Sequence, residues 1–174
     1  MNDLILVKPS MELKYKALDY KEEHMKIGES ELHGGALLDK MQYEDWLQLT
    51  DDNSCDETVH SDWVVSSTFF VYRKMDNKII GMVDIRHTLN DFLRNYGGHI
   101  GFGVRPSERR KGYATQILNI ALEQAKGLNL PKVMLACYKE NEPSRKTILK
   151  CGGNLEKEFL YSDGKHVQIY WINI

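Results

Sequence analysis

Residues 99–115, HIGFGVRPSERRKGYAT, constrain the fold of this chain more than any other stretch. Ile100, Phe102 and Val104 alternate with histidine or glycine, a period of two that is typical of a strand. The strand is expected to end at Pro106, because proline supplies no N–H group to a sheet. After a short turn, apolar residues recur at helical spacing; they are Ile117, Leu118, Ala121, Leu122, Ala125 and Leu128. The stretch therefore predicts a strand, a turn and a helix in direct succession.

The turn carries three adjacent cations, Arg109, Arg110 and Lys111, followed by Gly112. The first turn of a helix has free backbone N–H groups and the positive end of the helix dipole, so cations beside it predict a site for a phosphate or pyrophosphate. The glycine lets a ligand approach the backbone closely. The motif G-x-x-x-x-G-K-[ST] is absent, and Pro106 stands where a dinucleotide fingerprint needs glycine, so ATP and NAD are poor candidates.

The order Arg109-x-x-Gly112-x-Ala114 resembles the pyrophosphate loop, R/Q-x-x-G-x-G/A, of the GNAT superfamily of N-acetyltransferases, which move an acetyl group from acetyl-CoA to an amine. The resemblance extends over residues 98–153, because a strand at 132–138, an asparagine, a helix and a glycine follow in the family's order. It implies that the loop holds the pyrophosphate and that the pantetheine arm lies where the central strand splays from the strand at 132–138. The residues that it places against acetyl-CoA are Phe102, Gly103, Val104, Arg105, Arg109, Arg110, Lys111, Gly112, Tyr113, Ala114, Thr115, Asn141 and Ser144.

Both parts of this pattern also have a purely structural interpretation. A run of cations is often a solvated surface, and asparagine at 141 followed by proline at 143 is also expected at the start of a helix. The order of the two parts along the chain favours the ligand interpretation.

The resemblance implies direct attack of the amine on the thioester, with the oxyanion held by a backbone N–H near the end of the central strand, that of Val104 by analogy. A protonated amine cannot attack, so the reaction needs a route for proton removal. His99 is the preferred base because histidine titrates near neutral pH, and Asp84 and His87 are the alternatives. A single histidine on a strand is also often structural, held by a hydrogen bond.

The sequence departs from the family's pattern at two positions. Many members have a tyrosine seven residues after the asparagine and an aromatic residue after the glycine, where this chain has Ile148 and Gly153. That tyrosine protonates the leaving thiolate, so the general acid is unassigned here. Water, Tyr138 or Ser144 could supply the proton, or no acid is required, because a thiol with a pKa of about 8.5 is a tolerable leaving group.

Length and charge limit the remaining possibilities. With 174 residues and 42% hydrophobic composition, residues 1–174 are expected to form one domain with one core. Lysine and arginine number 23 against 25 aspartate and glutamate, a net charge of −2, which argues against a nucleic-acid partner. The first residues read as neither a signal peptide nor a membrane span, so we expect a cytoplasmic protein without a membrane partner. Three cysteines without a C-x-x-C pair fit reduced thiols, and six histidines without ligand spacing predict no metal site.

The rest of the chain alternates between strand and helix patterns. Strands are predicted at 4–7, 67–73, 78–87, 99–104, 132–138, 154–161 and 166–172, and helices at 11–27, 43–50, 114–127 and 143–150. Gly127 is the predicted cap of the third helix, and residues 89–98 have room for a short helix. This order matches the family's α/β (α+β) fold, which has a mixed, mostly antiparallel central sheet, splayed central strands and helices on both faces.

The sequence contains the fewest recognisable signals on the acceptor side. Residues 1–65 are interpreted as a variable acceptor-side region, and 98–153 as the acetyl-CoA-binding core. Residues 51–62 hold five carboxylates without a period, which fits either a solvated loop or an acidic lid over a cationic amine. A homodimer is left open, because Tyr170-Trp171 in the last strand could mark an edge used for pairing.

The sequence thus predicts an acetyl-CoA-dependent N-acetyltransferase whose acceptor is a primary amine of a small molecule or a peptide. No motif identifies that amine. Two alternatives stay open. A catalytically weak or inactive acyl-CoA-binding or sensing domain is favoured by the missing tyrosine, whereas a phosphate-anchored nucleic-acid binder is favoured only by the basic turn and opposed by the acidic balance.

Overall fold

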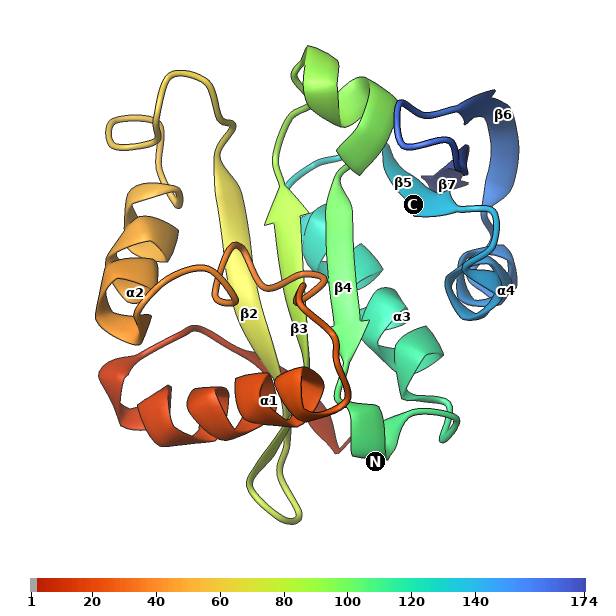
Figure 1. Ribbon diagram of the computed structural model, residues 1–174. Helices are drawn as coiled ribbons and strands as arrows, with labels where there is room; N and C mark the ends of the chain where they lie inside the picture. Colours follow the sequence, from red (N-terminus) through yellow and green to blue (C-terminus); the bar gives the residue numbers. More distant parts are fainter. Residues whose placement is uncertain (1–2) are drawn as a thin grey trace.

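The computed structural model describes residues 3–174, which contain two antiparallel sheets (Figure 1). Four strands form the first sheet in the order β1-β2-β3-β4, and three form the second in the order β5-β7-β6. The strands are β1 (Leu4–Val7), β2 (Ser66–Arg73), β3 (Lys78–Arg86), β4 (Ile100–Val104), β5 (Lys132–Tyr138), β6 (Asn154–Leu160) and β7 (His166–Asn173). Their order and positions confirm the predicted strands to within two residues.

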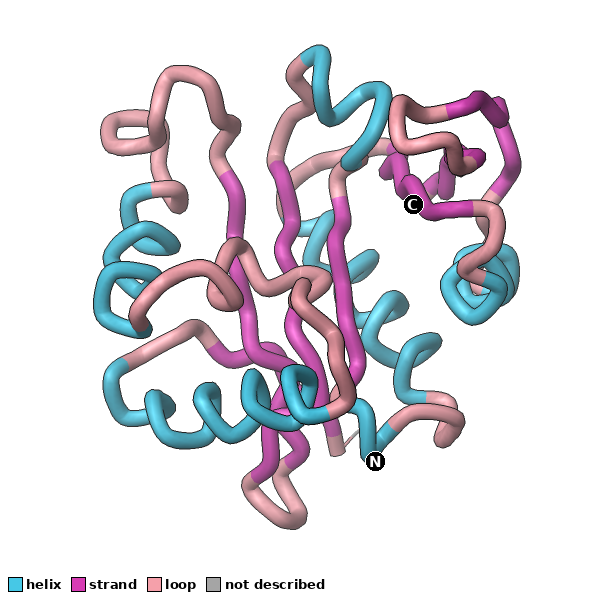
Figure 2. The backbone as a smooth tube through the Cα atoms, viewed as in Figure 1, coloured by secondary structure: helices cyan, strands magenta, loops and turns pink. Residues whose placement is uncertain are grey.

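Four α-helices and three short helical turns connect the strands (Figure 2). The helices are α1 (Lys14–Lys26), α2 (Tyr43–Asp52), α3 (Tyr113–Gly127) and α4 (Glu142–Lys150). The turns are η1 (Met11–Leu13), the π-helical η2 (Leu93–Gly97) and η3 (Pro106–Glu108). The sequence order of strands and helices is the predicted one, and η2 occupies the stretch where a short helix was expected.

Helices cover both faces of the first sheet, as predicted. Successive residues of β2 point to opposite faces, so Phe70 packs with Trp46 of α2 and Tyr20 of α1, whereas Val71 packs with Ile117 of α3. Each of these side chains is fully buried. One face of the sheet is therefore closed by α1 and α2, and the other by α3.

The two sheets separate between β4 and β5, which confirms the expected splay. A single isolated bridge joins Gly98 to Leu135, and the His99 N–H donates to the Met134 carbonyl at 2.8 Å. Beyond this point β4 and β5 belong to different sheets and diverge in Figure 1. In the described part of the chain, the central strand therefore has one edge without a partner strand.

Two expectations from the sequence are wrong. Helix α3 continues through Gly127, and its cap is Leu128, so the left-handed residue that follows is Asn129, with φ of 59°. Tyr170 and Trp171 lie on β7, which is the middle strand of the second sheet, so they mark no edge, and the outer strands are β5 and β6. No helix in the described part of the chain is long and apolar enough to cross a membrane.

Candidate active site

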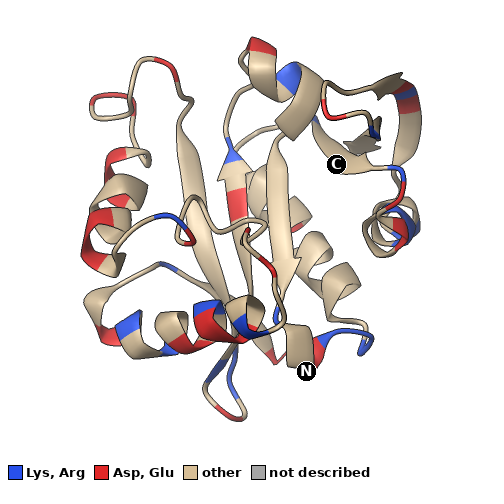
Figure 3. Cartoon of the chain, in the orientation of Figure 1, with Lys and Arg blue, Asp and Glu red and all other residues tan. Residues whose placement is uncertain are grey.

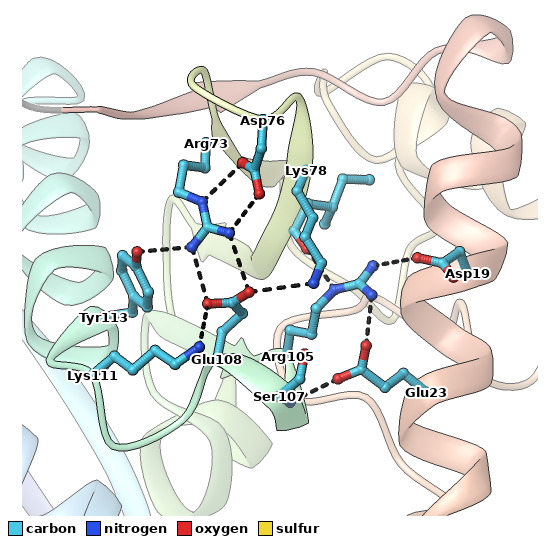
Figure 4. A network of polar contacts seen from close by, with 11 residues as sticks. Asp19, Glu23, Arg73, Asp76, Lys78, Arg105, Ser107, Glu108, Lys111 and Tyr113 are labelled. Atoms are coloured by element: carbon cyan, nitrogen blue, oxygen red, sulfur yellow. Dashed lines mark hydrogen bonds and ion pairs between the residues drawn. The ribbon is translucent and has the colours of Figure 1, made fainter.

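Arg105 ties the end of β4 to helix α1 (Figure 4). Its guanidinium is buried and donates to the Ile79 carbonyl at 2.8 Å, to Glu23 at 2.6 Å and to Asp19 at 2.8 Å. Its backbone N–H donates to the Ile80 carbonyl at 2.7 Å. The sequence places Arg105 beside acetyl-CoA, and the structure shows that its side chain is fully engaged inside the protein.

A second network anchors the turn that follows, and it centres on Glu108 of η3 (Figure 4). The buried carboxylate accepts from Arg73 at 2.9 and 3.1 Å, from Lys78 at 3.2 Å and from Lys111 at 3.0 Å. These hydrogen bonds, led by those from Arg73, lower the pKa of Glu108 to about 2. Arg73 also donates to the Tyr113 hydroxyl at 2.8 Å, so the turn and the first residue of α3 are held together.

The start of α3 presents free backbone donors. Gly112 precedes the helix with φ of 82°, and a Cβ atom at this position would meet no atom within 4 Å. Within residues 3–174, the N–H groups of residues 110–115 have no hydrogen-bond acceptor. Figure 3 shows the basic turn before α3 in blue. This geometry suits an anion, because unpaired N–H groups and the helix dipole point at the same place.

The three cations of the turn are not equivalent. Lys111 pairs with Glu108, and Arg109 forms a bidentate pair with Glu29 at 2.6 and 2.8 Å. No carboxylate of the described residues lies within 4 Å of the Arg110 guanidinium. Arg110 is therefore the cation that is already available to an anionic ligand.

Glu29 connects helix α1 to the basic turn. Besides Arg109, it contacts Nδ1 of the buried His24 at 2.7 Å, and these partners, Arg109 first, lower its pKa to about 2. Burial lowers the pKa of His24. Arg109 Nε also donates to the Val104 carbonyl at 3.2 Å, so the chain of contacts runs from α1 to the last residue of β4.

Backbone groups of β4 face the separation between the sheets. The Arg105 N–H bonds to β3 and the His99 carbonyl accepts from the Arg86 N–H at 2.7 Å, so odd-numbered residues of β4 form the ladder with β3. In an antiparallel pair the residues between them point their N–H and C=O groups the other way. Phe102 and Val104 therefore direct their N–H groups toward the side of β5.

The backbone of the acceptor-side loop, between α1 and α2, contacts the backbone of β4. A Cβ atom on Gly34 would lie 2.7 Å from the Met82 carbonyl and 2.8 Å from the Gly101 carbonyl. A Cβ atom on Gly103 would lie 2.6 Å from the His33 carbonyl. Only glycine permits these approaches. They bring the exposed His33 to the central strand, which the sequence did not predict, although the glycine pair at 34–35 was a signal of close packing.

The predicted base, His99, lies at the closed end of the separation. Its Nδ1 accepts from the Met134 N–H at 2.9 Å, which places the proton of the neutral ring on Nε2. Burial, aided by the charge of Arg86, lowers its pKa to about 4. This contact joins β4 to β5 across the two sheets.

The two alternative bases also have partners. Asp84 accepts from Thr68 at 2.9 Å and pairs with Arg86 at 2.8 Å, and His87 Nε2 lies 2.8 Å from the Ser67 hydroxyl. Burial lowers the pKa of His87.

The two positions that depart from the family's pattern, Ile148 and Gly153, pack against each other at the end of α4. Asn141 is the N-cap of this helix and accepts from the Ser144 N–H at 3.2 Å, as the helix-start interpretation expects. Ile148 is 1% exposed and belongs to the core that α3 closes. A Cβ atom on Gly153 would lie 2.8 Å from the Ile148 carbonyl, so no larger side chain fits there.

Within residues 3–174, no group of three or more histidine, cysteine, aspartate or glutamate side chains could hold a metal ion.

Residues 36–152 match the family model described as the acetyltransferase (GNAT) family. The chain belongs to this family. GNAT structures share its fold over almost their whole length, at low sequence identity. The microcin C7 self-immunity acetyltransferase MccE, solved with acetyl-CoA and AMP, is 19% identical at a TM-score of 0.68, with 100% of this chain and 94% of that chain covered. Spermidine N-acetyltransferase from Vibrio cholerae, a dodecamer, is 17% identical at 0.68, with 99% and 95% covered.

A third GNAT structure is a Vibrio cholerae protein provisionally assigned as a ribosomal-protein-serine acetyltransferase. It is 19% identical at a TM-score of 0.69, with 100% of this chain and 95% of that chain covered. No curated protein matches the sequence. At these identities the structural likeness establishes the shared fold.

Proposed function

We propose that this GNAT protein transfers an acetyl group from acetyl-CoA to a primary amine of a small molecule or a peptide, by direct attack of the amine. The observation that carries the proposal is the presence of two sets of backbone donors that have no acceptor among residues 3–174. One set lies at the start of α3, at residues 110–115, and the other on β4, at Phe102 and Val104. A long ligand with an anionic end and an amide-containing arm satisfies both sets.

The pyrophosphate of acetyl-CoA binds at the start of α3 in this proposal. It accepts from the N–H groups of residues 110–115 and pairs with Arg110, while Gly112 leaves space for it. Arg109 joins it by exchanging Glu29 for a phosphate oxygen. Tyr113 contributes its backbone N–H, because its hydroxyl is already held by Arg73.

The pantetheine arm lies against β4 in the separation between the sheets. The N–H groups of Phe102 and Val104 pair with it as with a neighbouring strand, and Asn141 and Ser144 line the opposite side at the start of α4. The thioester is then within reach of the Val104 N–H, which stabilises the oxyanion. The structural likeness to MccE, which was solved with acetyl-CoA, supports this cosubstrate.

The reaction forms an N–C bond and breaks the C–S bond. A neutral amine attacks the carbonyl carbon, the tetrahedral oxyanion collapses, and CoA departs as a thiolate. The proton of the amine goes to a base on the acceptor side. His33 is better placed than His99 for this role, because its side chain is exposed beside β4, whereas Nδ1 of His99 already accepts a hydrogen bond.

The leaving thiolate requires no protein acid in this scheme. Ile148 carries no proton to donate, and the Tyr138 hydroxyl donates to Asp163 at 2.8 Å, an interaction that raises its pKa to about 12. The buried Ile148 also favours a second candidate function, an acyl-CoA-binding domain that does not turn over.

Two measurements test the proposal. Calorimetric titration should give binding of acetyl-CoA at about micromolar strength, and ATP should bind more weakly. Thiol release from acetyl-CoA should then rise when amines are added. Binding without thiol release would support the sensing function, and absence of binding would overturn both.

A further inference from the structure

A cavity of about 610 Å³ opens on the acceptor side of the sheet. It lies between the loop that follows α1, the segment that follows α2, the end of β3 and η2. Gly34 and Arg86 line it, and a Cβ atom on Gly101 would lie 3.5 Å from the Gly34 nitrogen and 3.5 Å from Nη2 of Arg86. Two residues that line the cavity therefore lie beside β4, the strand along which the thioester is proposed to lie.

Large apolar side chains face the cavity without being covered. Trp63 is 43% exposed, Phe92 is 60% exposed and Leu37 is 41% exposed, and all three line it. The Phe92 ring lies 5.4 Å from that of Tyr96, which extends the apolar surface along η2. Apolar side chains grouped at one concavity and open to water favour a ligand with an apolar body, because binding removes both surfaces from water.

The charges of the cavity leave a negative excess. Two of its four carboxylates are neutralised by cations of the same cavity, since Asp39 pairs with Lys40 at 3.2 Å and Asp84 pairs with Arg86 at 2.8 Å. No lysine or arginine of the described residues lies within 4 Å of the other two, which are Glu31 and Asp62.

This excess attracts a protonated amine and repels a carboxylate. Asp62 ends the acidic segment 51–62, so one of the five carboxylates of that segment reaches the cavity.

Two polar side chains that line the cavity have unused hydrogen-bonding capacity. Asn53 is 4% exposed, lines the cavity, and its carboxamide has no partner among residues 3–174. The hydroxyl of Ser66, which is also buried and lines the cavity, has none either. Because both side chains line the cavity, their polar groups are available to a polar atom of a ligand bound there.

We propose that this cavity is the acceptor site and that the acceptor is a primary amine attached to an apolar, preferably aromatic, group, without a carboxylate beside the amine. The inference rests on the proposed acetyl transfer. The amine enters toward Gly34 and β4, Trp63 and Phe92 hold the apolar body, and Glu31 and Asp62 attract the cation before its proton is lost.

Three amines test the inference because ethylamine and phenylalanine each differ from phenethylamine by one group. Phenethylamine has the aromatic body, ethylamine lacks it, and phenylalanine adds a carboxylate. The kcat/KM for phenethylamine should exceed that for each of the others by at least about tenfold, since the phenyl group buries apolar surface and the carboxylate meets the negative excess. Calorimetry with the CoA complex, which cannot transfer, should show phenethylamine binding directly.

Trp63→Ala should weaken phenethylamine binding and lower its kcat/KM about tenfold, with acetyl-CoA affinity unchanged. The matched control is Tyr15→Ala, which removes another exposed aromatic residue, located on α1 outside the cavity, and should change neither value.

Equal kcat/KM for ethylamine, or a preference for spermidine that Trp63→Ala leaves intact, would overturn the inference while acetyl transfer stands. If no amine releases CoA, the proposed transfer fails. In that case phenethylamine binding that depends on Trp63 would still support the site, and absence of such binding would overturn it.

Discussion

Arg109 and Glu29 face each other in a bidentate ion pair, with Nη1 2.6 Å from Oε1 and Nη2 2.8 Å from Oε2. The pair joins the basic turn before α3 to the segment just after α1. It holds the arginine that the proposed pyrophosphate site would recruit. Glu29 thus competes with the ligand for one guanidinium.

Glu29→Gln should tighten acetyl-CoA binding by about two- to fivefold, since exposed ion pairs contribute roughly 0.2–1 kcal/mol and the variant no longer has to break one. Calorimetry at neutral pH measures the change. Glu22→Gln, which removes a second ion pair of α1 that lies outside the turn, is the control and should have no effect. Weaker acetyl-CoA binding in Glu29→Gln would mean that the ion pair positions the basic turn for the ligand and that Glu29 does not compete with the ligand for Arg109.

Gly112→Ala should lower acetyl-CoA affinity at least about tenfold, because the new methyl group would occupy the space left for the pyrophosphate. The left-handed backbone alone costs about 1 kcal/mol of stability. Gly164→Ala is a matched control, since Gly164 has the same φ of 82° and equally open surroundings in the β6–β7 turn. Both variants should lose similar stability in urea unfolding, and equal affinity in both would refute the site.

His33→Gln should lower kcat about a hundredfold and leave acetyl-CoA affinity unchanged, because the proton of the amine loses its acceptor. His166→Gln, which changes another exposed histidine that lies outside the cavity and pairs with Glu158, is the control. The pH profile of kcat decides between candidates. If kcat of the His33→Gln variant were unchanged and the His99→Asn variant were inactive, the base would be His99.

The free energy of unfolding should fall as the pH is lowered from about 6.5 toward 4. The pKa of His99 is about 4 in the folded chain, so the unfolded chain binds more protons throughout this range. The contribution of His99 is therefore complete above its unfolded pKa and is lost as the pH falls through its folded pKa. His99→Asn should flatten this dependence, and urea titrations at several pH values would reveal a failure to do so.

Gly153→Ala should destabilise the protein by about 1–3 kcal/mol, because its Cβ atom would press against Ile148. Gly127→Ala, at the exposed end of α3, should be neutral or stabilising by up to about 1 kcal/mol, since nothing lies within 4 Å of the added methyl group. Urea unfolding compares them. Equal stability of the two variants would show that α4 can move to make room.

The elements of this fold were predictable because their signals are local. The strand at 132–138 has a continuous apolar run from Val133 to Cys137, and the turn at 162–164 contains a glycine that adopts a positive φ. The separation of the two sheets came from the family resemblance rather than from the residues themselves. The cap at Gly127 failed because the helix simply continues for one more residue.

The partners of the site residues were not predictable. Arg105 and Arg109 pair with carboxylates about eighty positions earlier in the chain, and nothing local distinguishes an arginine that is free from one that is paired. The cavity was missed for a related reason. Trp63 and Phe92 lie in segments without a period, and only the folded chain brings them to one concavity.

The contacts of Gly34 and Gly103 make the meeting of the acceptor loop with β4 a contact between main chains. The distance between loop and strand is then set by backbone thickness and does not depend on which side chains surround it. Related proteins could replace the cavity residues and accept different amines without moving the transfer centre. Positions 34 and 103 should remain glycine even in relatives that use a different amine. Any Cβ atom there would push the acceptor loop away from β4.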